Sequence, residues 1–388
     1  GGALVLGAVP RIWRGFRARD FLWLGLGMAI LALSRPYEGL LVCLPAVAAL
    51  CWYLANKSHP PVSVLKRRSI PGLAPIAIAL AFMAYYDYRV FGSAFTPPYA
   101  LNRATYAIAP QFLWESARPA PVYRHPVMRE FYSGVEMAVF KRSRTLPGFL
   151  KSTAERLAGM EFFFVGFALL LPLVMLPRAL RDRRLRFLAV SAAVFATGQA
   201  IVTGFMPHYA APFTAGLYAL LLQSMRHLRA WRPQGRSAGL FLVRAIPILC
   251  FTLAGLRIYA EPLHIFLSPE PHAIGGWFGA NPLGLARAHV LKELESQPGK
   301  QLALVRYSPA HNVLDDWVYN AADIDKSSVV WARDMGAASN QELLLYYKDR
   351  TVWLVEPDTN LLAKIVDRKS SQILMGRVGS SEPNGNRP

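Results

Sequence analysis

Several kinds of residue are scarce in this chain of 388 residues. It has three cysteines, eight histidines and 24 aspartates and glutamates, against 43 lysines and arginines. Cys43 and Cys51 lie in one apolar run, too far apart on a helix for a disulfide, and Cys250 lies in another run. We expect three small, buried apolar side chains. No His, Asp and Glu cluster has the spacing of a metal site, so the sequence predicts no metal and no other cofactor.

The shortage of acidic residues is confined to one part of the chain. Residues 1–259 contain 30 Lys and Arg against 9 Asp and Glu, whereas residues 260–388 contain 13 against 15. A soluble protein this basic usually binds nucleic acid. Here the positive excess lies entirely in the part with long apolar runs, which is typical of a membrane protein that crosses the bilayer several times. We expect the lipid bilayer, and no nucleic acid, as a partner.

Apolar runs of about 20 residues predict membrane spans. We expect about seven full spans and a partial one at 2–10. The full ones are 21–35, 38–55, 70–88, 159–177, 187–205, 207–225 and 239–259. The chain has no initiator methionine and no signal peptide, and it starts as if within a span. We therefore expect it to be the C-terminal piece of a longer protein.

Four short connections set the predicted orientation. They contain 18 basic residues and two acidic ones, Asp20 and Asp182, and they fall on every second connection. The positive-inside rule places all four in the cytoplasm. The turn at 34–40, the long loop at about 89–158 and everything after about 260 then lie outside. We expect a multi-pass protein of the plasma (inner) membrane with an extracytoplasmic C-terminal domain.

The region after Tyr259 changes character. Short runs rich in Val, Leu and Trp predict strands at 301–307, 328–334 and 351–357, and residues 339–349 predict a helix capped by Ser339 or Asn340. The expected fold is thus an α-helical polytopic membrane domain (1–259) with a small C-terminal α/β domain outside the membrane (260–368). Residues 369–388 predict a disordered tail.

One short segment, SRPYEGL at 34–40, interrupts the apolar residues between Phe21 and Leu54. Arg35 and Glu38 are the ionisable groups in this run, and a charge in a membrane segment costs about 3 kcal/mol or more. Short spans broken by proline and glycine are typical of binding sites. A guanidinium suits an anionic group such as a phosphate. The alternatives are that Arg35 and Glu38 pair with each other, or that both extend to the interface as turn residues.

Two segments resemble a known family. LALSRPYEGLLVCLPA (31–46) resembles a short motif of the family 39-like membrane glycosyltransferases of GT-C type, which include lipid A aminoarabinose transferases and protein mannosyltransferases. PHYAAPFTAGLYALLL (207–222) resembles their Arg-Tyr-x-x-Pro segment at the start of a late span. The resemblance covers about residues 1–259 and implies a GT-C-like membrane domain.

The resemblance implies a sugar donor carried on a polyprenyl phosphate, and an acceptor glycan, lipid or protein. The basic residue of the first motif, here Arg35, would contact the donor phosphate. In the second motif His208 stands where the family has arginine, and Tyr209 and Pro212 follow. We therefore expect Arg35, His208 and Tyr209 at the donor phosphate. The family's main catalytic acid lies in the first outer loop, which would precede Gly1.

An inverting sugar transfer needs a carboxylate that accepts the proton of the acceptor. The candidates within this chain are Glu38, which shares a turn with Arg35, and Asp87 in AYYDYRVFG. Asp87 has two other interpretations: an ion pair with Arg89, or a cap for its own helix.

Two further groups suit ligands. In the long loop, Tyr99, Asn102, Arg103 and Tyr106 offer stacking and hydrogen-bonding groups for a sugar; the alternative is an ordinary aromatic loop at the membrane interface. In the C-terminal domain, Arg306, His311, Asp315 and Asp316 follow a predicted strand, where ligands of α/β folds bind. Stability of the domain explains the second group equally well.

Two main functional hypotheses remain. The first is a glycosyltransferase that acts at the extracytoplasmic face, and the second is a transporter or flippase of a lipid-linked or anionic substrate. A transporter needs polar residues in several spans, but the late spans contain few beyond Glu161, Gln199 and Arg257 near their ends. A third hypothesis, a membrane-anchored scaffold, predicts that loss of 260–388 abolishes function while Arg35→Ala does not.

Overall fold

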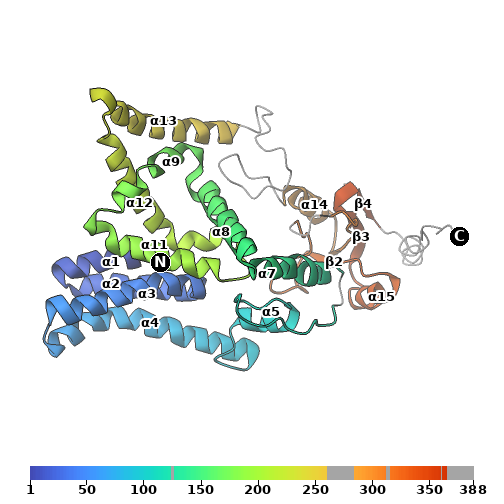
Figure 1. Cartoon of the computed structure of the whole chain (residues 1–388). Helices are drawn as coiled ribbons and strands as arrows, with labels where there is room; N and C mark the ends of the chain where they lie inside the picture. The colour runs from blue at the N-terminus through green and yellow to red at the C-terminus, as the bar shows by residue number, and fades with distance from the viewer. Residues whose placement is uncertain (124–125, 260–283, 312–314, 360, 365–388) are drawn as a thin grey trace. The chain divides into compact units, whose positions relative to one another are not determined.

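The computed structural model describes residues 1–123, 126–259, 284–311, 315–359 and 361–364. The chain divides into two compact units, and we describe each by itself. The helical unit is residues 1–259 and the sheet unit is residues 284–364 (Figure 1). The predicted tail at 369–388 lies outside the described residues.

Helices make up the first unit. Its α-helices are α1 Gly2–Gly15, α2 Ala18–Ser34, α3 Pro36–Tyr53, α4 Val62–Phe91, α5 Pro98–Tyr106, α6 Pro126–Arg129, α7 Met137–Ser143, α8 Leu146–Met160, α9 Gly166–Leu173, α10 Leu176–Ala179, α11 Arg186–Ala200, α12 Thr214–Arg229 and α13 Ala238–Tyr259. Three π-helical segments, η1 Leu54–Ser58, η2 Glu130–Glu136 and η3 Glu161–Val165, and three 3₁₀ segments, η4 Arg183–Leu185, η5 Pro207–Phe213 and η6 Pro233–Gly235, join or extend them.

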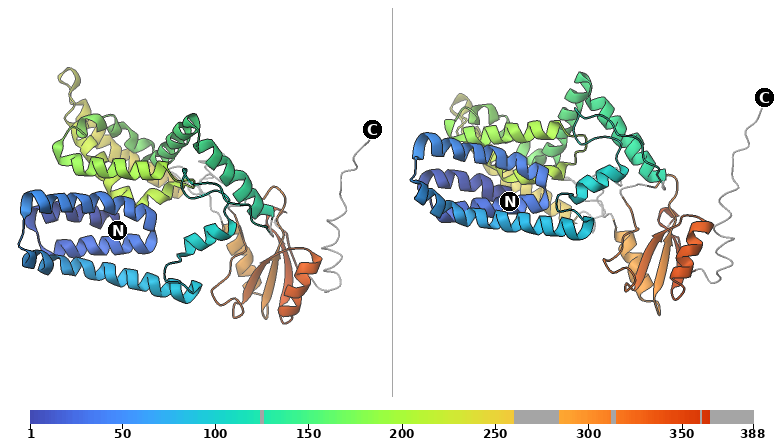
Figure 2. Two further views of the ribbon diagram at one scale, coloured as in Figure 1. Left: turned by 60° about the horizontal axis from the view of Figure 1, so that its bottom comes forward. Right: turned by 90° about the horizontal axis from the view of Figure 1, so that it is seen from below.

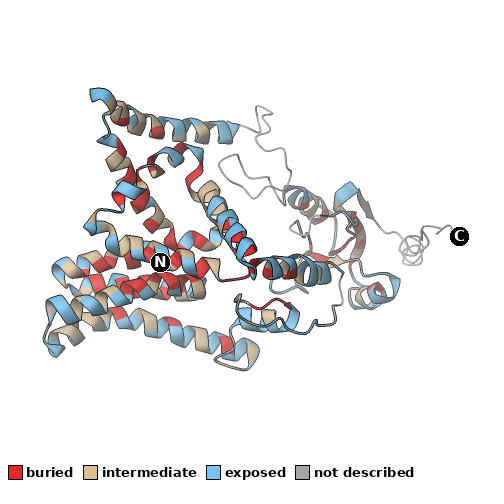
Figure 3. Ribbon diagram, viewed as in Figure 1, coloured by how far each residue is buried: buried red, intermediate tan, exposed pale blue. Residues whose placement is uncertain are grey.

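The core of the helical unit lies among α1, α2, α3, α11 and η5. It includes Val5, Ile12, Leu41, Phe195 and Phe213. Figures 1 and 2 show α1 to α4 running side by side. Figure 3 shows buried residues gathered along α1, α2 and α3, whereas α4 and α13 are largely exposed. Exposed apolar helices of this kind are typical of a surface that contacts lipid or a partner.

Within the residues that the structure describes, four helices are long and apolar enough to cross a membrane. They span Pro36–Lys57, Val62–Phe91, Leu146–Leu173 and Ala238–Tyr259. Their length and composition indicate a membrane-associated protein.

The helices at the remaining predicted spans are shorter than these four, or their α-helical geometry is interrupted. The α-helix predicted at 187–205 ends at Ala200. The one predicted at 207–225 begins as the 3₁₀ segment η5 and becomes α-helical at Thr214. Of the cysteines, Cys51 is exposed instead of buried, and Cys43 and Cys250 are partly buried; all three thiols are free.

The sheet unit has four strands in the order β2-β1-β3-β4. They are β1 Gln301–Val305, β2 Val329–Arg333, β3 Thr351–Glu356 and β4 Leu361–Lys364. β1 is parallel to both β2 and β3, and β4 is antiparallel to β3. The three predicted strands are thus confirmed; β4 was not predicted.

Two helices cover the two faces of this sheet (Figure 2). Leu294 of α14 (Leu285–Glu295) packs with Ala303 and Val305 on one face. α15 (Ala337–Tyr346) packs on the other face, over Leu302 and Leu304. Because both faces of β1 are covered, every residue of β1 is buried, which explains its continuous apolar sequence.

The start of α15 differs from the prediction. Gly336, with φ of 88°, is the residue before the helix, in place of Ser339 or Asn340 as its cap. Asn340 is buried instead, and its side chain donates to Asp334 and accepts from the backbone N–H of Met335.

The contact between α2 and α4 gives a test of the helical unit. A Cβ atom on Gly25 would overlap the carbonyl oxygen of Gly72, because the two backbones touch there. Gly25→Ala is expected to destabilise the protein by about 1–3 kcal/mol. Gly255→Ala in α13 is the control, since no atom lies within 4 Å of its Cβ position. Denaturant unfolding in micelles measures both, and equal stability of the two variants would contradict the packing.

Candidate functional site

The site predicted from SRPYEGL lies at the break between α2 and α3. Pro36 disfavours helical geometry at the residue before it, and Arg35 accordingly has φ of −144° and ψ of 79°. Its backbone still serves both helices, because its N–H donates to Leu31 and its carbonyl accepts from the N–H of Gly39. The break therefore fixes the position of the arginine between two helix ends.

The guanidinium of Arg35 lies on the ring of Tyr209. Its Cζ atom is 4.0 Å from the centre of that ring, within the range of a cation–π interaction. Arg35 is half-buried. Among the residues that the structure describes, no carboxylate forms an ion pair with it, so the alternative in which Glu38 neutralises it is wrong. The two motifs of the sequence thus meet in space.

Tyr209 is held by the 3₁₀ segment η5. Pro207 starts this segment, and the N–H of Tyr209 donates to the carbonyl of Met206 at 2.8 Å. His208 is exposed, and its ring meets that of Tyr209 edge-on at 4.8 Å. The tyrosine of the second motif thus contacts Arg35, while its histidine lies beside the tyrosine.

Glu38 lies in the first turn of α3 and is 9% exposed. The neighbouring Tyr37 donates a hydrogen bond to the carbonyl of Gly198 at 2.7 Å, which ties this turn to α11. No hydrogen bond or ion pair engages the Glu38 carboxylate within the described ranges. It is thus a buried acid close in sequence to an arginine that has no acidic partner.

Asp87 lies at the same end of the helical unit. α2 and α4 run in the same direction (Figure 1) and touch at Gly25 and Gly72. Asp87 is 15 residues past Gly72 and Arg35 is 10 residues past Gly25, so ideal parallel helices with a rise of about 1.5 Å per residue would offset the two by about 7.5 Å. It is 6% exposed. In the part of the chain that the structure describes it forms no ion pair with Arg89, whose guanidinium lies 6.0 Å from the Tyr85 ring.

Tyr99 of α5 is 54% exposed. Partial burial raises the pKa of Tyr99, the charge of Arg103 lowers it, and Glu136, Tyr209 and Glu38 raise it further. The site itself is defined by contact and by sequence: Arg35 lies on the ring of Tyr209, and Glu38 follows Arg35 by three residues. We call these three residues the Arg35 site.

The other residues predicted from the long loop lie differently. Arg103 donates to both carboxylate oxygens of Glu136, at 2.6 and 3.3 Å, and to the carbonyl of Ala109. Both side chains of this ion pair are nearly buried. Asn102 is exposed. Arg103 therefore holds the loop together. Tyr106, the fourth predicted residue of the loop, stacks with Tyr132.

The sequence did not single out Arg156 of α8, which is 8% exposed. Its guanidinium donates to the carbonyl of Gln199 in the last turn of α11 and to the carbonyls of Val202 and Thr203 after it. Thr203 in turn donates to Pro110 in the long loop. Arg156 therefore fixes the segment that leads into η5. The local sequence KSTAERL gave no signal for this role, because Glu155 directly precedes Arg156 and the pair is typical of an ordinary charged helix surface.

In the sheet unit, the charged residues after β1 are mutually paired. Arg306 forms ion pairs with Asp334 at 2.6 Å and Glu356 at 3.4 Å. His311 contacts the carboxylate of Asp358 at 2.8 Å and the carbonyl of Asp315 at 2.9 Å. These contacts join the carboxyl ends of three strands, so they serve the stability of the unit.

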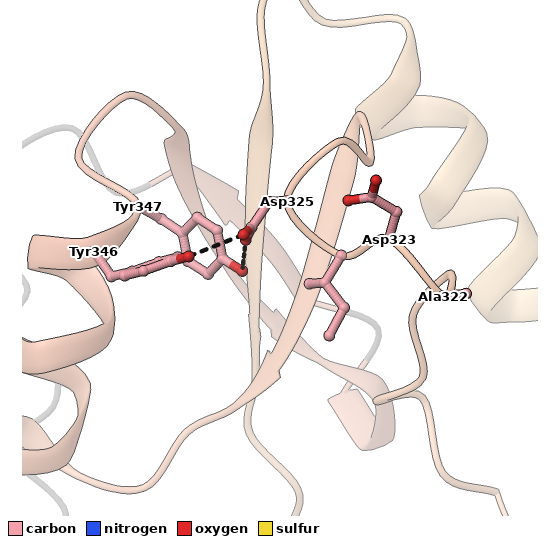
Figure 4. Close-up of a pocket in the computed structure, with 6 residues that line it drawn as sticks. Ala322, Asp323, Asp325, Tyr346 and Tyr347 are labelled. Carbon is pink, nitrogen blue, oxygen red and sulfur yellow. Dashed lines mark hydrogen bonds between the residues drawn. The ribbon is translucent and has the colours of Figure 1, made fainter. Parts of the chain in front are cut away.

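Asp316, also predicted from this group, accepts from the hydroxyl of Tyr307 and from Arg333. A shallow depression lies elsewhere on the unit and is lined by Ala322, Asp323, Ile324, Asp325, Tyr346 and Tyr347. Figure 4 shows both tyrosine hydroxyls bonded to Asp325. Across the described ranges, no three His, Cys, Asp or Glu side chains are grouped for a metal.

Removal of the Arg156 side chain tests its structural role. Arg156→Met leaves three carbonyls without their donor, and we expect a loss of about 2–4 kcal/mol of stability. Arg142→Met is the control: its ion pair with Glu155 is largely exposed and contributes about 0–1 kcal/mol. Similar losses in the two variants, measured by denaturant unfolding, would contradict the role of Arg156.

The surroundings of Asp334 predict how the stability of the sheet unit changes at low pH. Burial alone would raise the pKa of Asp334, but Asn340, Arg306 and the N–H of Gly336 lower it below its ordinary value of 3.8. Because the pKa of Asp334 is lower in the folded protein than in the unfolded chain, its ionised carboxylate stabilises the fold at any pH above the unfolded-state pKa. This stabilisation is lost as the pH falls through the folded-state pKa. The protection factors of the β1 amides, which correct for the slower intrinsic exchange in acid, should therefore fall below about pH 4.

The control for this effect is a second aspartate. Asp334→Asn should make the protection factors of the β1 amides less dependent on pH. Asp323→Asn should not, because Asp323 pairs with Lys326 at an exposed position. Equal pH profiles for the wild type and Asp334→Asn would show that another group is responsible.

Comparisons with protein-family models, with curated proteins and with solved structures find no match for this chain. The family resemblance therefore rests on the two short motifs at 31–46 and 207–222. The contact that joins these motifs in space is the cation–π interaction between Arg35 and Tyr209.

Proposed function

We propose that this chain is the membrane domain and C-terminal domain of a glycosyltransferase. It would move a sugar from a polyprenyl-phosphate donor to an acceptor at the extracytoplasmic face of the plasma membrane. The observation that supports this most is the position of Arg35, a half-buried guanidinium on the ring of Tyr209 at a helix break. Because no acid of the described chain pairs with it, its N–H groups are available to an anionic ligand.

The proposed reaction is the transfer of a sugar from a polyprenyl phosphate to a hydroxyl of the acceptor. A hydroxyl of the acceptor attacks the anomeric carbon of the sugar, and the bond from that carbon to the phosphate oxygen breaks. The hydroxyl proton passes to a carboxylate, and the polyprenyl phosphate leaves as an anion. Arg35 would stabilise the charge that develops on this phosphate. Glu38, buried one turn away in the sequence, is the acid of the site that could accept the proton.

The main experiment measures binding of undecaprenyl phosphate to the purified chain in lipid nanodiscs. Arg35→Ala is expected to weaken binding at least tenfold, because charge-assisted hydrogen bonds contribute about 1.5–3 kcal/mol. Arg35→Lys keeps the charge but loses the planar fork, so an intermediate affinity is expected. Arg144→Ala is the control, since Arg144 also lies near an aromatic ring, 5.4 Å from Phe140. Wild-type affinity in Arg35→Ala would overturn the proposal.

A transferase and a flippase would both bind this lipid, and a second assay separates them. With a lipid-linked sugar as substrate, a transferase releases free polyprenyl phosphate as the sugar is transferred. A flippase moves the intact lipid between leaflets and leaves the bond between sugar and phosphate unbroken. Movement of the lipid without release of its phosphate would favour the flippase.

A further inference from the structure

We infer that the long loop carries a sugar-binding surface formed by Tyr106, Tyr132 and Tyr123, which we call the tyrosine platform. This inference deepens the proposed function: the ligand class is a pyranose with a flat C–H face, and the sugar would belong to the acceptor. Its role as acceptor rests on the proposed function, but the binding itself can be tested without catalysis.

The three rings form a stepped, nearly parallel array. Tyr106 and Tyr132 have ring centres 6.1 Å apart and planes 16° apart. Tyr132 and Tyr123 are 6.3 Å apart at 6°. Rings in full face-to-face contact would have centres about 3.5–4 Å apart, so each ring steps past the next and leaves part of its face uncovered. Tyr106 is 39% exposed, and the other two are partly exposed.

Several contacts hold the tyrosine platform in shape. The hydroxyl of Tyr123 donates to the carbonyl of Tyr106 at 2.7 Å. Phe131 meets Tyr132 edge-on at 5.0 Å. The Arg103–Glu136 ion pair joins α5, which carries Tyr106, to η2, which carries Tyr132. A preorganised surface loses little conformational entropy when a ligand binds.

The chemistry of the platform suits a sugar ring. The face of an aromatic ring is negative, and the axial C–H groups of a pyranose with equatorial hydroxyls form a flat, weakly positive layer. The hydroxyls at the edge of the sugar need polar partners. Glu136 lies close enough to raise the pKa of both Tyr123 and Tyr132, in addition to the effect of burial. Its carboxylate oxygens can accept further hydrogen bonds beyond those from Arg103.

The loop that carries the platform is also joined to the segment that leads to Tyr209. The N–H of Thr203 donates to Gln111, and the N–H of Leu113 donates to Ile201. The platform and the Arg35 site thus belong to elements that contact one another. An aromatic belt at a membrane interface is the competing explanation, but the alignment of three rings around one ion pair favours a defined ligand.

Saturation-transfer NMR of the purified chain in nanodiscs tests this inference, with methyl β-D-glucopyranoside as the probe. Sorbitol is the control ligand, because it has similar hydroxyls but no rigid flat ring. We expect transfer to the ring C–H protons of the glucoside and little to sorbitol. Tyr132→Leu should reduce glucoside binding at least fivefold, whereas Tyr132→Phe should retain it. Tyr88→Leu is the control for an exposed tyrosine in α4.

Equal transfer to the glucoside and sorbitol, or unchanged binding in Tyr132→Leu, would overturn the inference. Relaxation of the platform by nitroxide-labelled lipid headgroups, without glucoside binding, would assign these rings to the membrane interface and would also overturn it. Arg35→Ala should leave glucoside binding unchanged. Failure of the platform and failure of the donor site are therefore distinguishable.

Discussion

The site of this protein depends on an arginine that is held by an aromatic ring instead of a carboxylate. A carboxylate would neutralise Arg35 and use its N–H donors, whereas the ring of Tyr209 at 4.0 Å orients the guanidinium and leaves the donors at its edge. Pro36 makes this arrangement possible, because it ends one helix and starts the next at the arginine. The proposed binding of an anion rests on this arrangement, in which no carboxylate of the described residues pairs with the guanidinium.

A second constraint keeps Tyr209 in place. Arg156 of α8 donates two hydrogen bonds to the segment between α11 and η5, at Val202 and Thr203, and one to Gln199 in the last turn of α11. The same segment pairs with the long loop, where the N–H of Leu113 donates to Ile201 and that of Thr203 to Gln111. The Arg35 site is thus supported by helices α3, α8 and α11 and by the loop that carries the tyrosine platform.

Sequence patterns predicted those features that depend on local composition. The strands β1 to β3 follow from short apolar runs, and Arg35 follows from a charge beside a proline in an apolar segment. Hydropathy did not show that 187–205 ends its helix at Ala200, because the bonds from Arg156 that replace the helical ones come from 43 residues away. Likewise, the pairing of Arg103 with Glu136 is a contact across 33 residues, which no local pattern contains.

We propose that Arg35 and Tyr209 act as one unit on an anionic ligand. A double-mutant cycle with Arg35→Ala and Tyr209→Ala, read out as affinity for undecaprenyl phosphate, measures the coupling between them. The double variant should lose less affinity than the sum of the two single losses, with a coupling of about 1 kcal/mol or more. Strictly additive losses would contradict it, because they would mean that the ring and the guanidinium act independently.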